Sequence, residues 1–74
     1  SIYPNPNKGE FTIAFKSRLQ NQLIEIYDLQ GKLIHERIQS NTKEWFNLNL
    51  APGNYLISIG EGKNRVSKPV VISE

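Results

Sequence analysis

Apolar and polar residues alternate along most of the chain. This period of two predicts β-strands, because successive side chains of a strand point to opposite faces. The alternation is clearest over residues 55–59, where Tyr55, Ile57 and Ile59 share one face. Leu56 makes the other face partly apolar as well, which favours a central strand over an edge strand. No helical period of useful length occurs, so the pattern predicts an all-β fold.

A tight turn leads into this strand. Pro52 sets its own φ for the first corner, and Gly53 adopts a backbone conformation that other residues reach only at a cost. Tyr55 follows this corner closely, an arrangement similar to the tyrosine corner of immunoglobulin-like sandwiches, whose ring seals one end of the core. We therefore expect Gly53 and Tyr55 to be determinants of the fold.

Short apolar or alternating stretches elsewhere supply strands for it to pair with. They are residues 2–3, 10–15, 23–28, 33–38, 44–50 and 65–72. Turn residues separate the stretches at intervals of about 8–12 residues, the spacing typical of a β-sandwich. The pattern therefore predicts six or seven short antiparallel strands in one sandwich.

The stretch 33–38 is expected to form a hairpin with 23–28, because Gly31 in the turn between them can take positive φ. Its facing is ambiguous. Leu33 and Ile34 are both apolar, which fits either a bulge or a half-covered edge.

The last stretch, 65–72, places Val66, Val70 and Ile72 on one face. Pro69 interrupts it and cannot donate a ladder hydrogen bond. The strand should therefore lie at an edge of its sheet or be broken at Pro69.

The loops are also visible in the sequence. Pro4-Asn5-Pro6-Asn7-Lys8-Gly9 forms a rigid turn and excludes a helix there. Polar connections are expected at 16–22 and 39–43, and a glycine-containing hairpin loop at 60–64.

Composition bounds the rest. A chain of 74 residues, here residues 1–74, indicates a single domain with a modest core. It has no cysteine for a disulfide or a thiolate metal site, and the absence of methionine suggests a piece cut from a longer protein. The net charge of +2 is scattered, which favours a solvated surface over a nucleic-acid interface. No apolar run approaches the ~20 residues that cross a bilayer, so we expect a domain that is not embedded in a membrane.

Residue patterns typical of enzymes are missing. His35 is the only histidine, and its neighbour Glu36 should face the opposite side of the sheet. Glu25 and Asp28 also lie on opposite faces, so they do not form a general acid–base pair. We expect no catalytic residue, no metal site and no cofactor, and we interpret His35 as a solvated strand residue.

Trp45 is the one candidate for a binding residue outside these patterns. If Phe46 points inward, Trp45 points outward, where it could stack on a sugar ring or a protein partner, or simply cover its neighbours. The alternative functions are therefore a carbohydrate-binding or adhesive β-sandwich and a spacer between domains.

Three motifs follow one another in order along the chain, at residues 2–13, 23–32 and 48–59. They resemble the patterns Y-P-N-P-x-x-G, V-x-I-Y-D/N-x-x-G-K/Q and L-x-x-L-x-x-G-x-Y of the type A C-terminal sorting domain of the type IX (Por) secretion system. The positions that carry the resemblance, or that we expect to determine the fold, are Tyr3, Pro4, Asn5, Pro6, Gly9, Tyr27, Gly31, Gly53 and Tyr55.

The resemblance implies a seven-stranded, immunoglobulin-like antiparallel β-sandwich at the C-terminus of a larger exported bacterial protein. Such a domain is a non-catalytic, monomeric secretion signal. Its partners are the type IX translocon, a cell-surface sortase and the upstream cargo in the same precursor. The domain passes through the periplasm. The sortase then cuts before Ile2, and the cargo is anchored to the cell surface or released.

Recognition in this family is associated with the final strand, here Lys68, Pro69, Val70, Val71 and Ile72. The chain departs from the family's more basic ending, because it inserts Pro69 and ends in Ser73-Glu74. An edge strand that presents unpaired backbone groups and Val71 could instead accept an added strand from a receptor. Val70 and Ile72 either fill the core or contact the receptor.

Overall fold

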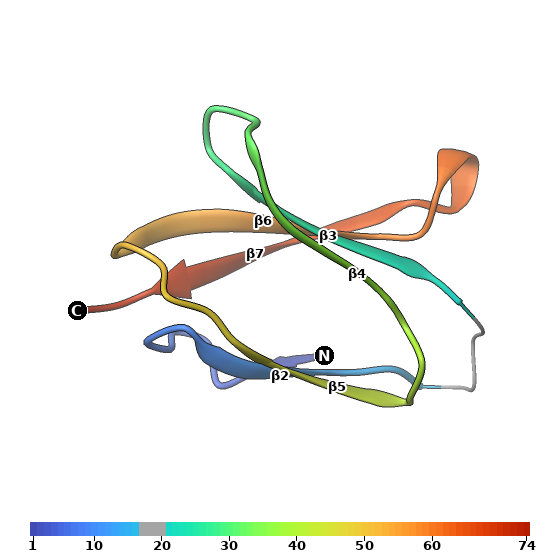
Figure 1. Cartoon of the computed structure of the whole chain (residues 1–74), viewed down its shortest axis with the longest axis horizontal. Helices are drawn as coiled ribbons and strands as arrows, with labels where there is room; N and C mark the ends of the chain where they lie inside the picture. Colours follow the sequence, from blue (N-terminus) through green and yellow to red (C-terminus); the bar gives the residue numbers. More distant parts are fainter. Residues whose placement is uncertain (17–20) are drawn as a thin grey trace.

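The computed structural model describes residues 1–16 and 21–74 and shows a sandwich of two antiparallel sheets (Figure 1). The strands are β1 (Ile2–Tyr3), β2 (Glu10–Ala14), β3 (Leu23–Asp28), β4 (Leu33–Ile38), β5 (Lys43–Asn47), β6 (Gly53–Ile59) and β7 (Val66–Ile72). One sheet has the order β1-β2-β5 and the other β4-β3-β6-β7. The predicted all-β, seven-stranded sandwich is confirmed.

The central and edge positions also follow the sequence. β6 lies between β3 and β7, as its partly apolar outer face indicated. β7 lies at the edge, and its Pro69 stands opposite Leu56 of β6. In the residues that the structure describes, the only helix is a short 3-10 turn, Gly62–Asn64, within the predicted hairpin loop.

The core fills the space between the two sheets. The rings of Phe11 and Phe46 stack at its centre with centroids 5.1 Å apart. Around them lie the side chains that alternation assigned inward, which are Ile13, Ile24, Ile26, Tyr55, Ile57, Val70 and Ile72. β5 ends at Asn47, earlier than expected, but Leu48 and Leu50 still pack against this core.

The turn before β6 forms the expected tyrosine corner. The hydroxyl of Tyr55 donates a 2.6 Å hydrogen bond to the carbonyl oxygen of Ala51, while its ring packs in the core. One hydrogen bond thereby fixes the turn at Pro52 and Gly53 to the end of the sandwich.

The β3–β4 hairpin closes around Asp28. Its Oδ1 accepts hydrogen bonds of 2.9 Å from the amides of Gln30 and Lys32, and Gly31 takes a φ of 87° as expected. The predicted connection at 16–22 is only partly described, because residues 17–20 lie outside the described part of the chain.

The ambiguity in β4 is settled by a bulge at an edge. The register shifts between Ile26 and Tyr27, so that Ile26 pairs with His35 and Tyr27 with Leu33. The shift leaves Leu33 and Ile34 exposed. Both explanations left open by the sequence are therefore correct, because β4 has a bulge and also lies at an edge of its sheet.

Candidate functional site

The five positions expected to carry recognition divide by the alternation of β7. Val70 is fully buried and Ile72 is 2% exposed, so both side chains fill the core. Lys68, Pro69 and Val71 are exposed. The folded domain therefore offers the side chains of Lys68, Pro69 and Val71 to a partner, but not those of Val70 and Ile72.

The outer edge of β7 is covered by the loop between β1 and β2. The amide of Val71 donates a 2.9 Å hydrogen bond to Oδ1 of Asn5, and the Val71 carbonyl oxygen accepts one of 3.0 Å from the amide of Asn7. Beyond the strand, the Ser73 amide donates a 2.6 Å hydrogen bond to the carbonyl oxygen of Asn7. Asn7 pairs with Ile72 as an isolated parallel bridge. We call residues 5–7 the edge clamp.

The clamp corrects one expectation from the sequence. The edge strand was expected to present Val71 together with unpaired backbone groups, but both backbone groups of Val71 are hydrogen-bonded to the clamp. Asn5 Nδ2 also reaches the Pro69 carbonyl oxygen at 3.4 Å. The sequence indicated an edge strand correctly, but it did not show which loop lies beside that edge.

Parity along β7 shows where the edge remains open. In an antiparallel ladder, backbone groups alternate between the partner strand and the outside. Since Val71 faces the outside, Pro69 and Ser67 do so too, and β7 pairs only with β6. No partner is found for the Ser67 backbone within the described ranges 1–16 and 21–74.

Asn7 holds the clamp in shape and was not singled out from the sequence. It is 6% exposed, its Nδ2 donates to the Pro4 carbonyl oxygen at 2.9 Å, and its Oδ1 accepts from the Gly9 amide at 2.7 Å. An asparagine side chain often accepts a hydrogen bond from the backbone amide two residues later. The Asn7-Lys8-Gly9 sequence therefore did indicate this turn.

Gly9 closes the loop against Leu48, which follows β5 at the same end of the small sheet. Its φ is +109°, and a Cβ at this position would overlap the carbonyl oxygen of Leu48. Its own carbonyl oxygen accepts a 2.8 Å hydrogen bond from the Leu48 amide. Both the backbone conformation and the close approach therefore require glycine.

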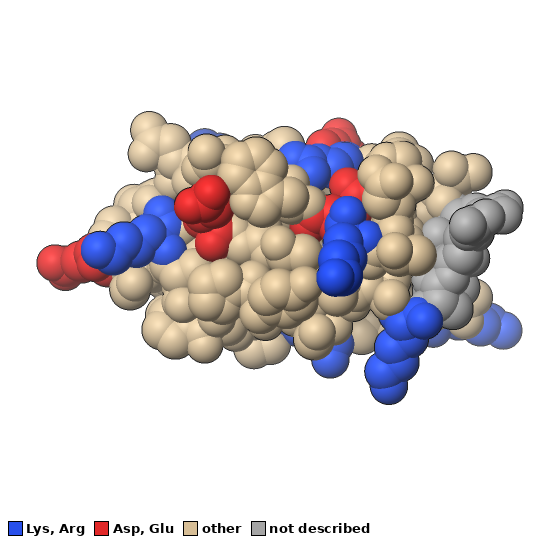
Figure 2. Space-filling view, turned by 90° about the horizontal axis from the view of Figure 1, so that it is seen from below, with Lys and Arg blue, Asp and Glu red and all other residues tan. Residues whose placement is uncertain are grey.

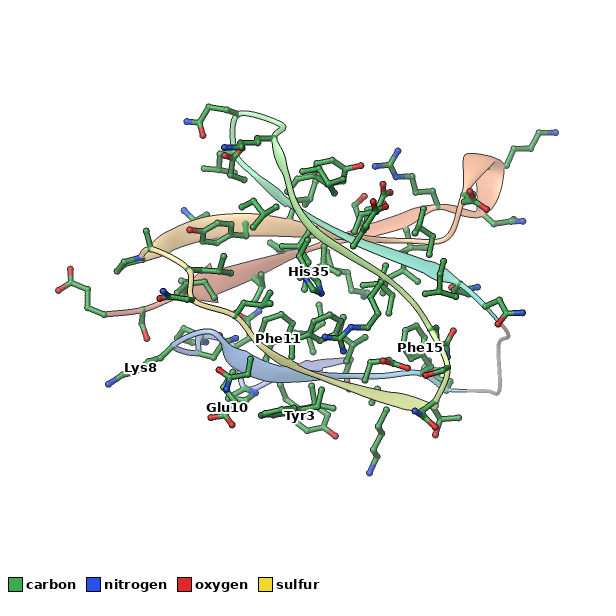
Figure 3. The ribbon with its side chains drawn as sticks, in the orientation of Figure 1. Tyr3, Lys8, Glu10, Phe11, Phe15 and His35 are labelled. Carbon is green, nitrogen blue, oxygen red and sulfur yellow. The ribbon has the colours of Figure 1, made fainter. Side chains whose placement is uncertain are left out.

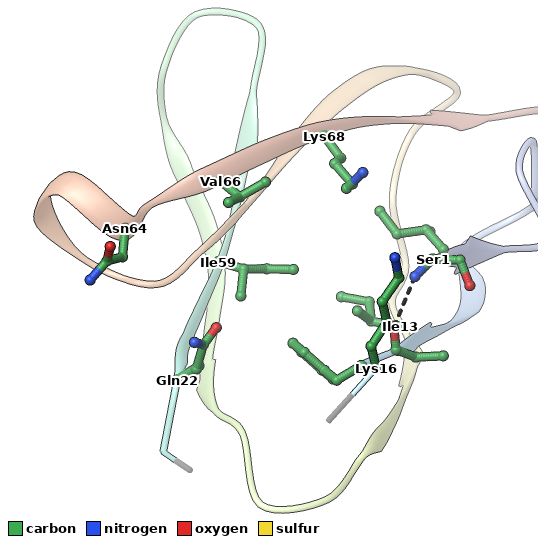
Figure 4. A pocket seen from close by; sticks show the side chains of 11 residues that line it. Ser1, Ile13, Lys16, Gln22, Ile59, Asn64, Val66 and Lys68 are labelled. Atoms are coloured by element: carbon green, nitrogen blue, oxygen red, sulfur yellow. Dashed lines mark hydrogen bonds between the residues drawn. The ribbon is translucent and has the colours of Figure 1, made fainter. Parts of the chain in front are cut away.

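An open cleft lies between β2 of the small sheet and β7 of the larger sheet (Figure 4). Its volume is about 360 Å³. Ile13 and Phe15 line it from the β2 side, and Ile59 and Val66 line it from the β6–β7 side. Its remaining lining residues are Ser1, Ile2, Ala14, Lys16, Gln22, Asn64 and Lys68.

A polar cluster closes the opposite side of the sandwich. Arg37 of β4 lies over the ring of Phe46, with its guanidinium carbon 3.9 Å from the ring centroid. The same guanidinium donates a 2.7 Å hydrogen bond to the Trp45 carbonyl oxygen of β5 and lies 3.5 Å from the Glu44 carboxylate. Arg37 thus joins the edges of the two sheets.

Glu44 is the buried carboxylate of this cluster. Burial alone would raise its pKa, but hydrogen bonds from the amides of Ser40 and Asn41, at 2.8 Å each, and the nearby Arg37 cation hold the pKa below the ordinary value of 4.5. The charge therefore stabilises the folded loop.

His35 corrects a second expectation. It is half-buried rather than solvated, and its ring meets Phe46 edge-on at 5.8 Å. Its Nε2 is buried without a partner in the part of the chain that the structure describes. Burial lowers the pKa of His35 below 6.5, and Arg37 lowers it further, against a weaker opposing effect of Glu36. The bulge in β4 accompanies this inward placement of His35 and Arg37.

The outer face of the small sheet carries two exposed aromatic residues. Tyr3 pairs with Thr12, and Thr12 pairs with Trp45, so the three form one row across β1, β2 and β5. Tyr3 is 44% exposed and Trp45 55% exposed, and Tyr3 lies below the sheet in Figure 3. The face seen from below in Figure 2 shows a broad uncharged area with charged side chains scattered around it. The outward position of Trp45 is confirmed.

Tyr27 and Arg65 pack together on the outer face of the larger sheet. The guanidinium carbon of Arg65 lies 5.7 Å from the Tyr27 ring centroid. Nη2 of the same guanidinium lies 3.9 Å from Oε1 of Glu25. Arg65 also donates a hydrogen bond to the hydroxyl of Ser58, and Ser58 is buried although alternation assigned it outward.

Among the described residues, no group of three or more histidine, cysteine, aspartate or glutamate side chains could hold a metal ion. No described helix is both long and apolar enough to cross a membrane.

Comparison with known protein families identifies a related family. The model of the Por_Secre_tail family, described as a secretion system C-terminal sorting domain, matches residues 1–73. No curated protein matches the chain.

Proposed function

Because this chain belongs to the family of secretion system C-terminal sorting domains, we propose that residues 1–74 form a single, non-catalytic type IX sorting domain that carries an upstream cargo across the outer membrane. The type IX translocon recognises the domain on the periplasmic side. A cell-surface sortase then removes it, and the cargo is anchored to the surface or released. The domain acts as a monomer and as a substrate of this machinery.

The observation that carries the proposal is the extent of the family match, which covers residues 1–73. This range includes Pro4 and Pro6, the Gly31 turn and the tyrosine corner. The tyrosine corner ties the turn before β6 to the core, and β7 lies beside β6 at the edge of the larger sheet.

Recognition is assigned to β7, at Lys68, Pro69, Val70, Val71 and Ile72. Burial divides their roles. Lys68, Pro69 and Val71 are exposed for contact, whereas Val70 and Ile72 anchor the strand in the core.

The test is an export assay. The domain, preceded by a signal peptide and a periplasmic reporter, is expressed in a host with a working type IX system, and surface reporter is measured. We expect the reporter at the surface or in the medium. A reporter that stays in the periplasm, although the fused domain is folded, contradicts the proposal.

Point variants separate recognition from folding better than a truncation does, because deleting residues 70–74 removes buried side chains. Val71→Glu changes an exposed side chain and should reduce export without lowering the melting temperature. Leu29→Glu, at an exposed position in the β3–β4 turn, is the matched control and should be exported normally.

A carbohydrate-binding or adhesive function is the second candidate, and the row Tyr3–Thr12–Trp45 favours it. Two exposed aromatic rings on one flat face can stack on sugar rings. Titration of plant and bacterial polysaccharides against Trp45 fluorescence tests this. A response that Tyr3→Ala weakens supports it, and no response across these glycans removes it.

A further inference from the structure

We propose that the cleft between β2 and β7 binds an extended partner segment that carries acidic and apolar side chains and pairs with β7 at Ser67. The identity of the partner as export machinery rests on the proposed function above. The site itself is inferred from three features of the domain: an apolar floor, a basic rim and an open stretch of strand edge.

The apolar floor of the cleft comes from both sheets. Ile13 and Phe15 contribute to it from the β2 side, and Ile59 and Val66 from the β6–β7 side. Val66 is 51% exposed and Phe15 is only partly buried, so apolar surface remains in contact with solvent there. An apolar side chain that enters the cleft would remove this surface from water, which favours binding.

The rim is basic. Lys68 is on the same face of β7 as the buried Val70, so its side chain lies over the cleft rather than on the outer face, while Lys16 lines the β2 side. The lining residues include no aspartate or glutamate, and neither lysine forms a salt bridge within the described ranges. The Ser1 amine also lies in the lining, but it is hydrogen-bonded to the Ala14 carbonyl oxygen (Figure 4). A carboxylate is therefore the complementary group for the two lysines.

The strand edge gives the partner its conformation. The edge clamp occupies the outer groups of Val71 and reaches Pro69, which itself has no amide hydrogen. Ser67 is the next residue with outward groups, and its neighbours Val66 and Lys68 line the cleft. A segment that pairs with Ser67 would be extended, and its alternate side chains would enter the cleft.

The clamp thus moves the expected point of strand addition from the end of β7 to its beginning. Pairing at Val71 would first require the bonds to Asn5 and Asn7 to break. Pairing at Ser67 requires no such loss.

The experiment titrates the ¹⁵N-labelled 74-residue chain with a capped peptide, Val-Thr-Glu-Thr-Val, whose valines and glutamate share one face of an extended strand, and with a matched peptide that has lysine in place of glutamate. The acidic peptide should shift the amide signals of Val66, Ser67 and Lys68, and the basic peptide should not. Absence of shifts with the acidic peptide at millimolar concentration, or shifts centred elsewhere, overturns the proposal.

Charge reversal tests the rim. Lys16→Glu combined with Lys68→Glu should weaken binding of the acidic peptide by about tenfold, as expected for losing attractive charge pairs and gaining repulsive ones. Lys32→Glu combined with Lys63→Glu makes the same change in net charge on exposed loops and should leave affinity within about twofold. Equal loss in both double variants overturns a specific basic rim.

Ser67→Pro tests the backbone pairing. It removes an outward amide that β6 does not use, so the melting temperature should stay close to that of the unchanged chain while peptide binding falls. Binding that persists in a folded Ser67→Pro variant overturns the pairing.

Export of the reporter fusion then separates the two proposals. If the unchanged domain is not exported, the sorting function fails, whatever the peptide titration shows. If it is exported and Lys16→Glu with Lys68→Glu is exported equally well, the export machinery is not the partner of this cleft. Loss of export in that variant, with an unchanged melting temperature, supports it.

Discussion

The backbone amide of Val71 donates a 2.9 Å hydrogen bond to the side-chain oxygen of Asn5, a residue 66 positions away in sequence. The opening loop of the chain and its last strand are therefore one structural unit. Substitutions in the loop should therefore alter the stability of β7, the strand that we propose to carry recognition.

Asn5→Ala should loosen the end of β7 while the sandwich remains folded. One exposed hydrogen bond contributes about 1 kcal/mol, so the Val71 amide should exchange with solvent about fivefold faster. Hydrogen exchange followed by NMR measures this. Asn47→Ala, at an exposed position of β5, is the control and should leave the Val71 amide unchanged. Unchanged exchange in Asn5→Ala would mean that the clamp does not protect the edge.

Tyr55 contributes to stability through both its ring and its hydroxyl. Tyr55→Phe removes the hydrogen bond to Ala51 and should lower the free energy of unfolding by about 1 kcal/mol. Tyr55→Ala also empties part of the core and should cost about 3–5 kcal/mol. Urea denaturation measures both. Tyr3→Ala, at an exposed position, should have little effect, and a similarly small effect of Tyr55→Ala would contradict its place in the core.

Glu44 should make stability depend on acid pH. Its pKa lies below 4.5 in the folded chain and is taken to be 4.5 in the unfolded chain, so the carboxylate stabilises the fold fully above pH 4.5. That contribution is lost as pH falls through the lower folded value. Denaturant midpoints measured from pH 7 to pH 2 should therefore fall less steeply in Glu44→Gln than in the unchanged chain. Glu61→Gln, in an exposed loop, should keep the original slope.

Two glycine positions should respond differently to alanine. Gly31 has a φ of +87° with open space around it, so Gly31→Ala should cost about 1–2 kcal/mol for the left-handed backbone alone. Gly9→Ala meets the carbonyl oxygen of Leu48 as well, so its loss of unfolding free energy should be clearly larger. Equal losses, measured by denaturant unfolding, would contradict the close approach of the loop to Leu48.

The fold was predictable because alternation is a local property. Phe11, Ile57 and Val70 are inward in the structure as the period of two required, and the Pro52–Gly53 corner positions Tyr55 as expected. The family assignment rested on turn residues of the same local kind.

Alternation did not predict that polar side chains of β4 face the interior, or that the outer edge of β7 is hydrogen-bonded to a loop. His35 and Arg37 face inward because a bulge shifts the register of β4 and because Phe46, from the other sheet, offers them an aromatic surface. The clamp on Val71 depends on a contact between opposite ends of the sequence. A pattern read along one strand contains no information about either partner.

The parallel bridge between Asn7 and Ile72 also has a mechanical consequence. Tension applied between the two ends of the chain would pull these parallel segments along their length in opposite directions. The hydrogen bonds between the loop and the strand would then bear the load together, in shear, instead of opening one after another.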